Sequence, residues 1–480
     1  MTQSIVSRAP GLGAWGTSAV AITVALAIGL GVALGGPWFA PAFAAAVIAA
    51  LVLFSPELGV LFLVVQFFFL GSLVTLGYLP HAALWLPDII IASLVLRVLA
   101  LSRGGTRGLV APRSLLVACV TLTALCLASS AINGMGGMEV LIGLRFYLKY
   151  PLLFFVLLNC EIGPRFFIRL MAGFIVIAAI QIPVSAFQYA SLGGVDDANA
   201  GTMGFTGGQD LLFLALVAMT FLLTWVFIRR RELGYVLLAL GMLVAPILAS
   251  VRAALVFGPV AFVIVIARAI SLDAKRFSAT AVKVSLIAVV GVLLAAASSF
   301  LGSAIAENSF SRVGGIAAQE SRGGLESTGR ITAARSAASI IAGSPASTVL
   351  GYGPGSAHAS RLAYGGLNQS ATFRLTRHQV SATLLELGWA GIAALAVIIW
   401  MAWRITIRAR FGHGEMGDAI IFSGPLVVVN FALMQGYFAA WTGGNASPLL
   451  FWLVLAAVYV IDHEPSPDPA VGLQRRGYLL

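Results

Sequence analysis

Residues 376–403 read TRHQVSATLLELGWAGIAALAVIIWMAW, and this stretch decides how the chain is organised. It passes from polar sequence through Arg377, His378 and Gln379 into an apolar run long enough to cross a bilayer as a helix. The residues before it, from about Gly302, are rich in glycine, serine and arginine, whereas most of the remaining chain is apolar. We therefore expect a membrane scaffold that positions one long polar loop, and we expect the chemistry in that loop.

The composition is that of a polytopic membrane protein. Of the 480 residues, 60% are hydrophobic and 10% are charged, and the mean hydropathy is +0.98. We predict an all-α integral membrane fold with about 12–14 transmembrane helices and one long external loop. In this single membrane domain, residues 1–301 hold about the first eleven helices, residues 302–378 the external (periplasmic) loop, and residues 379–480 the last three helices and a cytoplasmic tail.

The spans are predicted from the apolar runs. They are 18–35, 38–54, 58–79, 88–101, 114–131, 143–159, 165–189, 210–228, a ninth that ends at 250, 252–270, 280–301, 380–403, 418–437 and 448–461.

Positive charge is concentrated in alternate short loops. These loops carry Arg103, Arg107 and Arg113; Arg165 and Arg169; Arg229 to Arg231; Lys275 and Arg276; and Arg404, Arg408 and Arg410. The positive-inside rule then predicts cytoplasmic termini and an external long loop. Membrane topology explains the net charge of +11 better than nucleic-acid binding, which we exclude.

Three basic residues are predicted to lie near helix starts on the external side: Arg145, Arg252 and His378. A helix start offers unpaired N–H groups and the positive end of the helix dipole, so two such ends bearing guanidinium groups could hold a diphosphate. Lys149 follows Arg145 by one turn on the same face and would need an anionic partner inside the membrane. The alternative for each arginine is a side chain that snorkels to the interface.

The long loop adds further guanidinium groups, which suit an anionic substrate. They belong to Arg312, Arg322, Arg330, Arg335, Arg361, Arg374 and Arg377. We expect Arg377 to help bind the diphosphate. At the end of the loop, the helix start and the neighbouring arginines should keep His378 neutral, so that it can accept a proton from a sugar hydroxyl. The alternative for His378 is a capping role, and Glu386 is expected to be a buried polar anchor.

Other polar residues have simpler interpretations. The odd set Cys119, Cys126 and Cys160 predicts packing rather than disulfides, and no spacing indicates a metal site. Asp196 and Asp197 are interpreted as a turn, and the glycines of residues 351–355 lack the context of a nucleotide-binding loop. Interhelical hydrogen bonds are expected from Gln66, Gln181, Gln188, Asn430 and Gln435.

Several short segments occur in a characteristic order around the long loop. They are Arg252-Ala-Ala-Leu, Gly329-Arg330, Leu350-Gly-Tyr-Gly-Pro-Gly355, and His378-Gln379 followed by Leu385-Glu-Leu-Gly-Trp-Ala-Gly391. In this order the second half of the chain resembles the O-antigen ligase and O-antigen polymerase superfamily of membrane glycosyltransferases.

The resemblance implies a GT-C-like fold in the bacterial inner membrane, with the active site facing the periplasm. It implies inverting transfer of a glycan from undecaprenyl diphosphate to an acceptor sugar, without metal or cofactor. Arg252 and Arg330 would bind the diphosphate and His378 would assist the acceptor hydroxyl. The family often has Asn or Ser after the histidine, whereas this chain has Gln379.

The acceptor and the class of activity stay open. A polymerase would extend another lipid-linked glycan, which we favour slightly, and a ligase would transfer the chain to a lipid A core or a protein. Partners could include other polysaccharide-assembly proteins. The alternative is a polysaccharide or lipid-linked oligosaccharide flippase or transporter, for which charged residues through the depth of several helices would be expected. An inactive membrane scaffold would not explain why Arg145, Arg252 and His378 share one side.

Overall fold

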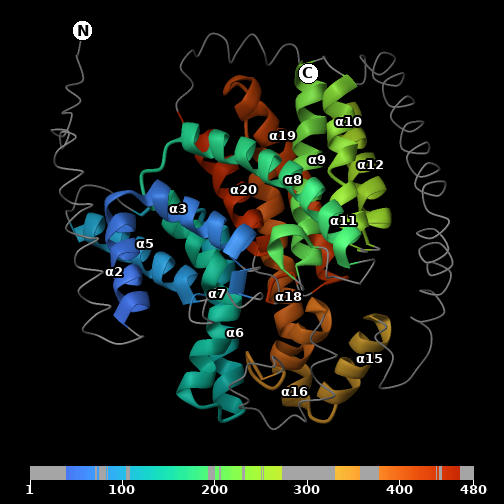
Figure 1. Cartoon of the computed structure of the whole chain (residues 1–480). Helices are drawn as coiled ribbons and strands as arrows, with labels where there is room; N and C mark the ends of the chain where they lie inside the picture. The colour runs from blue at the N-terminus through green and yellow to red at the C-terminus, as the bar shows by residue number, and fades with distance from the viewer. Residues whose placement is uncertain are drawn as a thin grey trace.

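The computed structural model describes residues 39–70, 73–74, 83, 85–103, 109–192, 200–204, 207–229, 233–249, 251, 253–272, 330–356, 378–438, 440–442 and 446–464. Within these ranges every regular element is a helix (Figure 1). The elements are α2 (Phe39–Phe54), α3 (Pro56–Val65), η1 (Gln66–Leu70), α5 (Leu86–Arg103), α6 (Arg113–Ile132), α7 (Gly137–Asn159), α8 (Pro164–Leu192), η3 (Gly201–Met203), α9 (Gly208–Arg229), α10 (Leu233–Gly241), α11 (Val244–Leu248), α12 (Ala254–Leu272), α15 (Arg330–Ile341), α16 (Pro345–Leu350), α18 (Gln379–Arg408), α19 (Gly414–Gln435) and α20 (Ala446–His463).

The fold is that of an all-α integral membrane protein, as predicted. Among the described residues, eight helices are long and apolar enough to cross a membrane, namely α6, α7, α8, α9, α12, α18, α19 and α20. Large apolar side chains on the outer helices face away from the protein, such as Val117 (64% exposed) on α6 and Phe187 (73% exposed) on α8. A bilayer explains this exposure, because lipid takes the place of water there. The predicted spans 18–35 and 280–301 lie outside the described residues.

Most predicted spans agree with the helices to within a few residues, but four differ, one of which is the span that starts at residue 380. The helix predicted from residue 143 begins at Gly137, because the Glu139 carboxylate accepts a hydrogen bond from the Gly136 N–H at 3.0 Å and stabilises an earlier start. The span predicted from residue 58 changes at Gln66 from α3 to the π-helix η1. The ninth span consists of two short helices, α10 and α11, separated at residues 242–243.

The helix after the long loop folds back on itself at Gly388. This glycine has φ 61° and ψ −159°, which no helical residue adopts. A Cβ built on Gly391 would lie 3.1 Å from Thr383 Cγ2, whereas residues 383 and 391 are about 12 Å apart on a straight helix. The predicted straight span is therefore two helices, residues 379–387 and residues 389–408, joined by a sharp turn.

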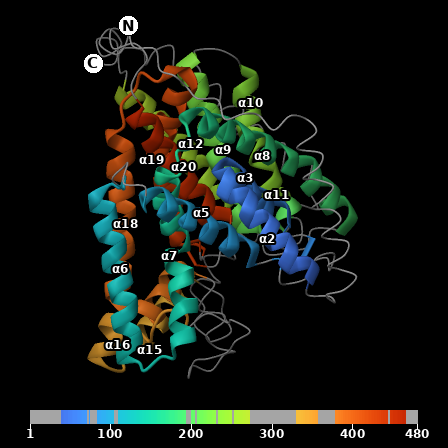
Figure 2. The same ribbon diagram turned by 90° about the vertical axis from the view of Figure 1, so that its left-hand side faces the viewer.

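Part of the predicted long loop is helical and packed. The helix α15 lies against the first part of α18 through a buried cluster of Ala333, Ala337, Ile341, Leu384 and Leu385. The short helix α16 also packs against α18. The remaining parts of the loop, residues 302–329 and 357–377, lie outside the described residues. Figure 2 shows α15 and α16 at one end of the molecule, beside the end of α6 and the start of α7.

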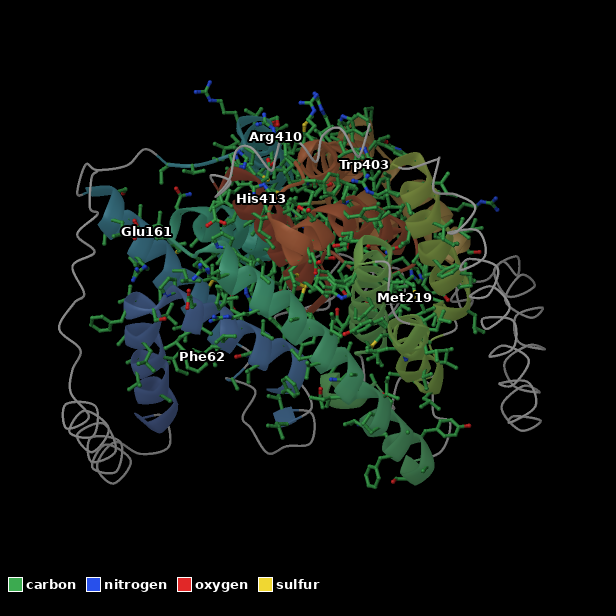
Figure 3. The ribbon with its side chains drawn as sticks, turned by 90° about the horizontal axis from the view of Figure 1, so that it is seen from above. Phe62, Glu161, Met219, Trp403, Arg410 and His413 are labelled. Atoms are coloured by element: carbon green, nitrogen blue, oxygen red, sulfur yellow. The ribbon has the colours of Figure 1, made fainter. Side chains whose placement is uncertain are left out.

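The opposite end, which we name the basic end, carries several of the basic turns. The start of α6 meets the end of α7 where Asn159 Nδ2 donates to Val110 O at 2.9 Å. The α18–α19 turn meets the end of α20 where Arg410 N–H donates to Asp462 Oδ1 at 2.7 Å. The rings of Phe154 on α7 and Tyr459 on α20 are 6.4 Å apart and join these two groups. Figure 3 looks onto this end, with Arg410 and His413 labelled.

Candidate functional site

His378 is the residue that immediately precedes α18, as predicted. It has extended backbone dihedrals (φ −123°, ψ 134°), its carbonyl accepts from Ala382 N–H at 2.9 Å, and it is only 8% exposed. Its Nδ1 lies 3.2 Å from the carbonyl oxygen of Tyr437. Because a carbonyl oxygen can only accept, this contact favours the tautomer with the proton on Nδ1 and leaves Nε2 as the basic nitrogen.

Gln379 holds the start of α18 to the turn between α19 and α20. Its Oε1 accepts hydrogen bonds from the backbone N–H groups of Trp441 and Thr442, both at 3.0 Å. Its Nε2 donates to Thr383 Oγ1 at 3.0 Å, and its own N–H donates to Phe438 O at 3.2 Å. Gln379 is thus a buried anchor that fixes the backbone beside His378. This role of the turn that contains Trp441 was not predicted from the sequence.

Tyr437 joins the start of α18 to the start of α12. Its ring packs edge-on against Phe257 in the first turns of α12, with ring centroids 5.6 Å apart at 89°. Since its carbonyl also contacts His378, the two helix starts lie together on the side away from the basic end. Arg252, predicted for this site, lies outside the described residues, and α12 begins two residues after it.

The start of α15 lies on the same side as His378. The ends of α15 and of the first part of α18 are tied together, because Tyr352 donates from its N–H to Leu385 O at 2.8 Å and from its hydroxyl to Ile340 O at 3.0 Å. Because α15 and the first part of α18 pack together and their C-terminal ends lie side by side, the two helices run parallel. Their starts therefore also lie near each other. Arg330 is the first residue of α15. Arg377 lies outside the described residues.

Arg145 and Lys149 differ from their predicted arrangement. Because α7 begins at Gly137, Arg145 is eight residues into the helix rather than within about one turn of its start, so the helix dipole does not favour an anion there. Arg145 makes a bidentate pair with Asp88, with Nε–Oδ1 at 2.9 Å and Nη2–Oδ2 at 2.6 Å. Lys149 Nζ lies 3.4 Å from Asp88 Oδ1. The anionic partner that Lys149 requires is therefore a side chain of α5.

Aromatic rings enclose this cluster. The Arg145 guanidinium lies 4.4 Å from the centroid of Trp85, and Lys149 Nζ lies 5.4 Å from Phe67 and 5.5 Å from Tyr150. One carboxylate faces two cations, so Asp88, Arg145 and Lys149 together keep a net positive charge. Sequence periodicity identified the shared face of Arg145 and Lys149, but their pairing with Asp88 was not predicted.

The opposite face of α7 contacts the first part of α18. The Tyr147 hydroxyl donates to Glu386 Oε2 at 2.9 Å, and Tyr147 O accepts from Trp441 Nε1 at 3.1 Å. Glu386 is completely buried, which confirms its prediction as a polar anchor. Positions 145 and 149 lie one turn apart, and position 147 lies on the other side of the helix. The Asp88 cluster and the contacts around His378 are thus on different faces of α7.

The segment of residues 350–355 is wedged between α6, α7 and the turn in α18. Ser129 Oγ donates to Leu350 O at 2.5 Å, and Gly353 N–H donates to Glu386 O at 2.9 Å. A Cβ on Gly143 would lie 2.1 Å from Pro354 O, so only glycine permits this approach. Gly351 also serves close backbone packing, because a Cβ built on it would lie 2.4 Å from the carbonyl carbon of Glu386.

The predictions for the cysteines and for Asp196 and Asp197 can now be compared with the structure. Cys119, Cys126 and Cys160 are free and buried, as expected for packing residues. Within the described ranges, no group of His, Cys, Asp or Glu could hold a metal, and Asp196 and Asp197 lie outside them.

Of the amide side chains predicted to form hydrogen bonds between helices, four bond another segment and one bonds its own helix. Asn430 Nδ2 reaches Thr220 Oγ1 on a neighbouring helix at 3.4 Å, and Gln181 and Gln188 bind η3. Gln66 Nε2 donates to Ala83 O at 2.6 Å, between η1 and the segment before α5. Gln435 instead bonds its own helix at Phe431 O, because that carbonyl lies one turn below it.

No protein-family model matches the chain, and no curated protein is similar to it at a significant level.

Proposed function

We propose that the protein is a membrane glycosyltransferase that moves a glycan from a lipid diphosphate to an acceptor sugar. The observation that carries this proposal is the meeting of two helix starts at Tyr437, with His378 buried between them. Helix starts attract anions, and a neutral imidazole beside them can act as a base. Undecaprenyl diphosphate as carrier, the bacterial inner membrane, a periplasmic site and cytoplasmic termini are parts of the same proposal.

In the proposed reaction, the acceptor hydroxyl attacks the sugar carbon that is bonded to the diphosphate. The new glycosidic bond forms as the bond between that carbon and the diphosphate oxygen breaks, which inverts the configuration at the carbon. The hydroxyl proton passes to His378 Nε2, and the lipid diphosphate leaves with the bonding electrons. Arg252, Arg330 and Arg377 are proposed to stabilise its charge, since guanidinium groups bind phosphate oxygens bidentately.

The decisive experiment measures the lipid-linked glycans in a strain that lacks the gene. Accumulated single repeat units would indicate a polymerase, and accumulated finished chains would indicate a ligase. Complementation with His378→Ala should leave the accumulation unchanged although the protein is present in the membrane. His413→Ala is a matched control, because His413 also precedes a helix, α19, but at the basic end. Normal glycans with His378→Ala would refute the proposed base.

A carrier for lipid-linked sugars is the second candidate, and the Asp88 cluster favours it. Arg145 and Lys149 are charged groups inside the membrane helix α7 and pair with Asp88 of α5, and charged groups within membrane helices are typical of transport routes. The two functions predict opposite sensitivities in reconstituted vesicles. A carrier should lose translocation of a lipid-linked sugar with Asp88→Asn and keep it with His378→Ala. A glycosyltransferase should lose product formation with His378→Ala, even when substrate is supplied on the side where it acts.

A further inference from the structure

The first step is to locate the segment of residues 350–354 relative to the basic end. Ser129, which binds Leu350 O, lies 16 residues after Arg113 along α6, or about 24 Å. Gly143, which touches Pro354, lies 16 residues before Asn159 along α7, again about 24 Å. Two independent helices thus agree on the depth.

A third helix gives the same depth. Gly388, whose neighbour in space is Val349 O, lies 16 residues before Arg404 along the second part of α18, or about 24 Å. The hydrocarbon core of a bilayer is about 30 Å thick. If the basic end marks one boundary of that core, the segment after α16 lies inside the opposite leaflet, not beyond it.

The start of α18 lies closer to the middle of the membrane than the segment of residues 350–354 does. Gln379 is held by Trp441, which bonds Tyr147 O, and Tyr147 lies 12 residues before Asn159, or about 18 Å from the basic end. The first part of α18 therefore starts about 18 Å from the basic end and runs away from the membrane centre, to about 24 Å from the basic end, before it turns at Gly388. Because α15 runs parallel to it, Ile331 lies deeper in the membrane than Ser339.

The exposed side chains of α15 and α16 change from apolar to polar in the direction that this difference in membrane depth predicts. Ile331 is 56% exposed, and Arg335 and Ser339, one and two turns later on the same face of α15, are also exposed. Val349 on α16 and Trp389 after the turn are each 53% exposed. An apolar residue followed by arginine, with a tryptophan nearby, is the order expected from hydrocarbon to headgroup.

We propose that α15 and α16 are embedded in one leaflet of the bilayer and contact its phospholipids directly. Hydrocarbon chains cover Ile331 and Val349, and lipid phosphates face Arg335. The exposed apolar surface of α6 continues into this region through Leu127 (48% exposed) and Ile132 (58% exposed), which favours lipid over a protein partner. Part of the segment expected to be an external loop is then a re-entrant structure, and lipid lies beside the start of α18.

Site-directed spin labelling in phosphatidylglycerol–phosphatidylethanolamine vesicles tests this proposal. Single cysteines are introduced at Ile331, Ser339 and Val349 and carry a nitroxide, while the three native cysteines stay buried. Collision rates are measured with oxygen, which concentrates in lipid, and with a water-soluble nickel chelate. Val120→Cys on α6 (Val120 59% exposed) is the lipid control, and Glu415→Cys at the basic end is the water control.

We expect the ratio of oxygen to nickel collisions at Ile331 to approach that at Val120 and to fall by several-fold toward Ser339. Val349 should be intermediate, which keeps the test decisive if the label at Ile331 prevents folding. Ratios at Ile331 and Val349 equal to that at Glu415 would overturn the proposal. Low collision rates with both reagents at both sites would also overturn it, because they would indicate a protein partner. Neither result depends on whether the protein transfers glycans.

Discussion

The hydroxyl of Tyr147 donates a hydrogen bond of 2.9 Å to Glu386 Oε2 and so connects α7 to the first part of α18. Both side chains are completely buried. The same α7 residue accepts from Trp441 Nε1, so three segments that are distant in sequence meet at Tyr147.

Tyr147→Phe should destabilise the protein by about 1–3 kcal/mol, because a buried carboxyl group loses a hydrogen-bond donor. The measurement is the midpoint of unfolding in mixed detergent micelles. Tyr235→Phe is the control, since Tyr235 is partly buried and its hydroxyl has no hydrogen bond to another described residue. Equal midpoints for the wild type and Tyr147→Phe would contradict the prediction.

Gly388→Ala should disrupt the turn in α18. Its φ of +61° costs an alanine about 1–2 kcal/mol, and the added Cβ would lie 2.4 Å from Val349 O, which adds a steric penalty. We expect a lower unfolding midpoint and faster proteolysis of residues 330–356. Gly343→Ala serves as the control, because its nearest contact would be Ile340 O at 3.6 Å and its φ is not positive. Comparable effects of the two substitutions would show that the turn is not required.

Asp88→Asn should destabilise the junction of α5 and α7. Exposed ion pairs contribute about 0–1 kcal/mol and loss of one partner of a buried pair costs about 3–5 kcal/mol. The Arg145 and Asp88 side chains are 29% and 24% exposed, so we expect a loss between these limits. A double-mutant cycle with Arg145→Gln measures the coupling, and Glu57→Gln in α3 is the control. A coupling energy near zero would argue against the pair.

The native thiols should resist alkylation in the folded protein. Cys160 follows α7 at the basic end, where burial raises the pKa of its thiol to about 12. Its reactive thiolate is therefore scarce at pH 7 to 9 and increases only as the pH approaches this pKa. Maleimide should label none of the three cysteines at pH 7.5 and all three after unfolding in dodecyl sulfate. Rapid labelling of the folded protein would show that the helices open.

Sequence periodicity and hydropathy were sufficient to predict the membrane class and most helix ends, because an apolar run of this length has few other stable structures. The same patterns predicted that His378 precedes a helix and that Glu386 is buried. They failed where tertiary contacts decide the conformation. The turn at Gly388 depends on the backbone of residues 349–353, and the early start of α7 depends on the Glu139 carboxylate.

The sequence by itself thus determined that the chain is an all-α membrane protein with one polar interruption that ends at His378. Only the tertiary structure decided that Asp88 pairs with Arg145, that Gln379 holds the α19–α20 turn, and that Tyr437 brings α12 and α18 together. The physical reason is the separation along the chain between the residues that interact. Hydrophobic periodicity acts between residues a few positions apart, whereas these contacts join residues more than 50 positions apart, whose pairing depends on how the helices pack.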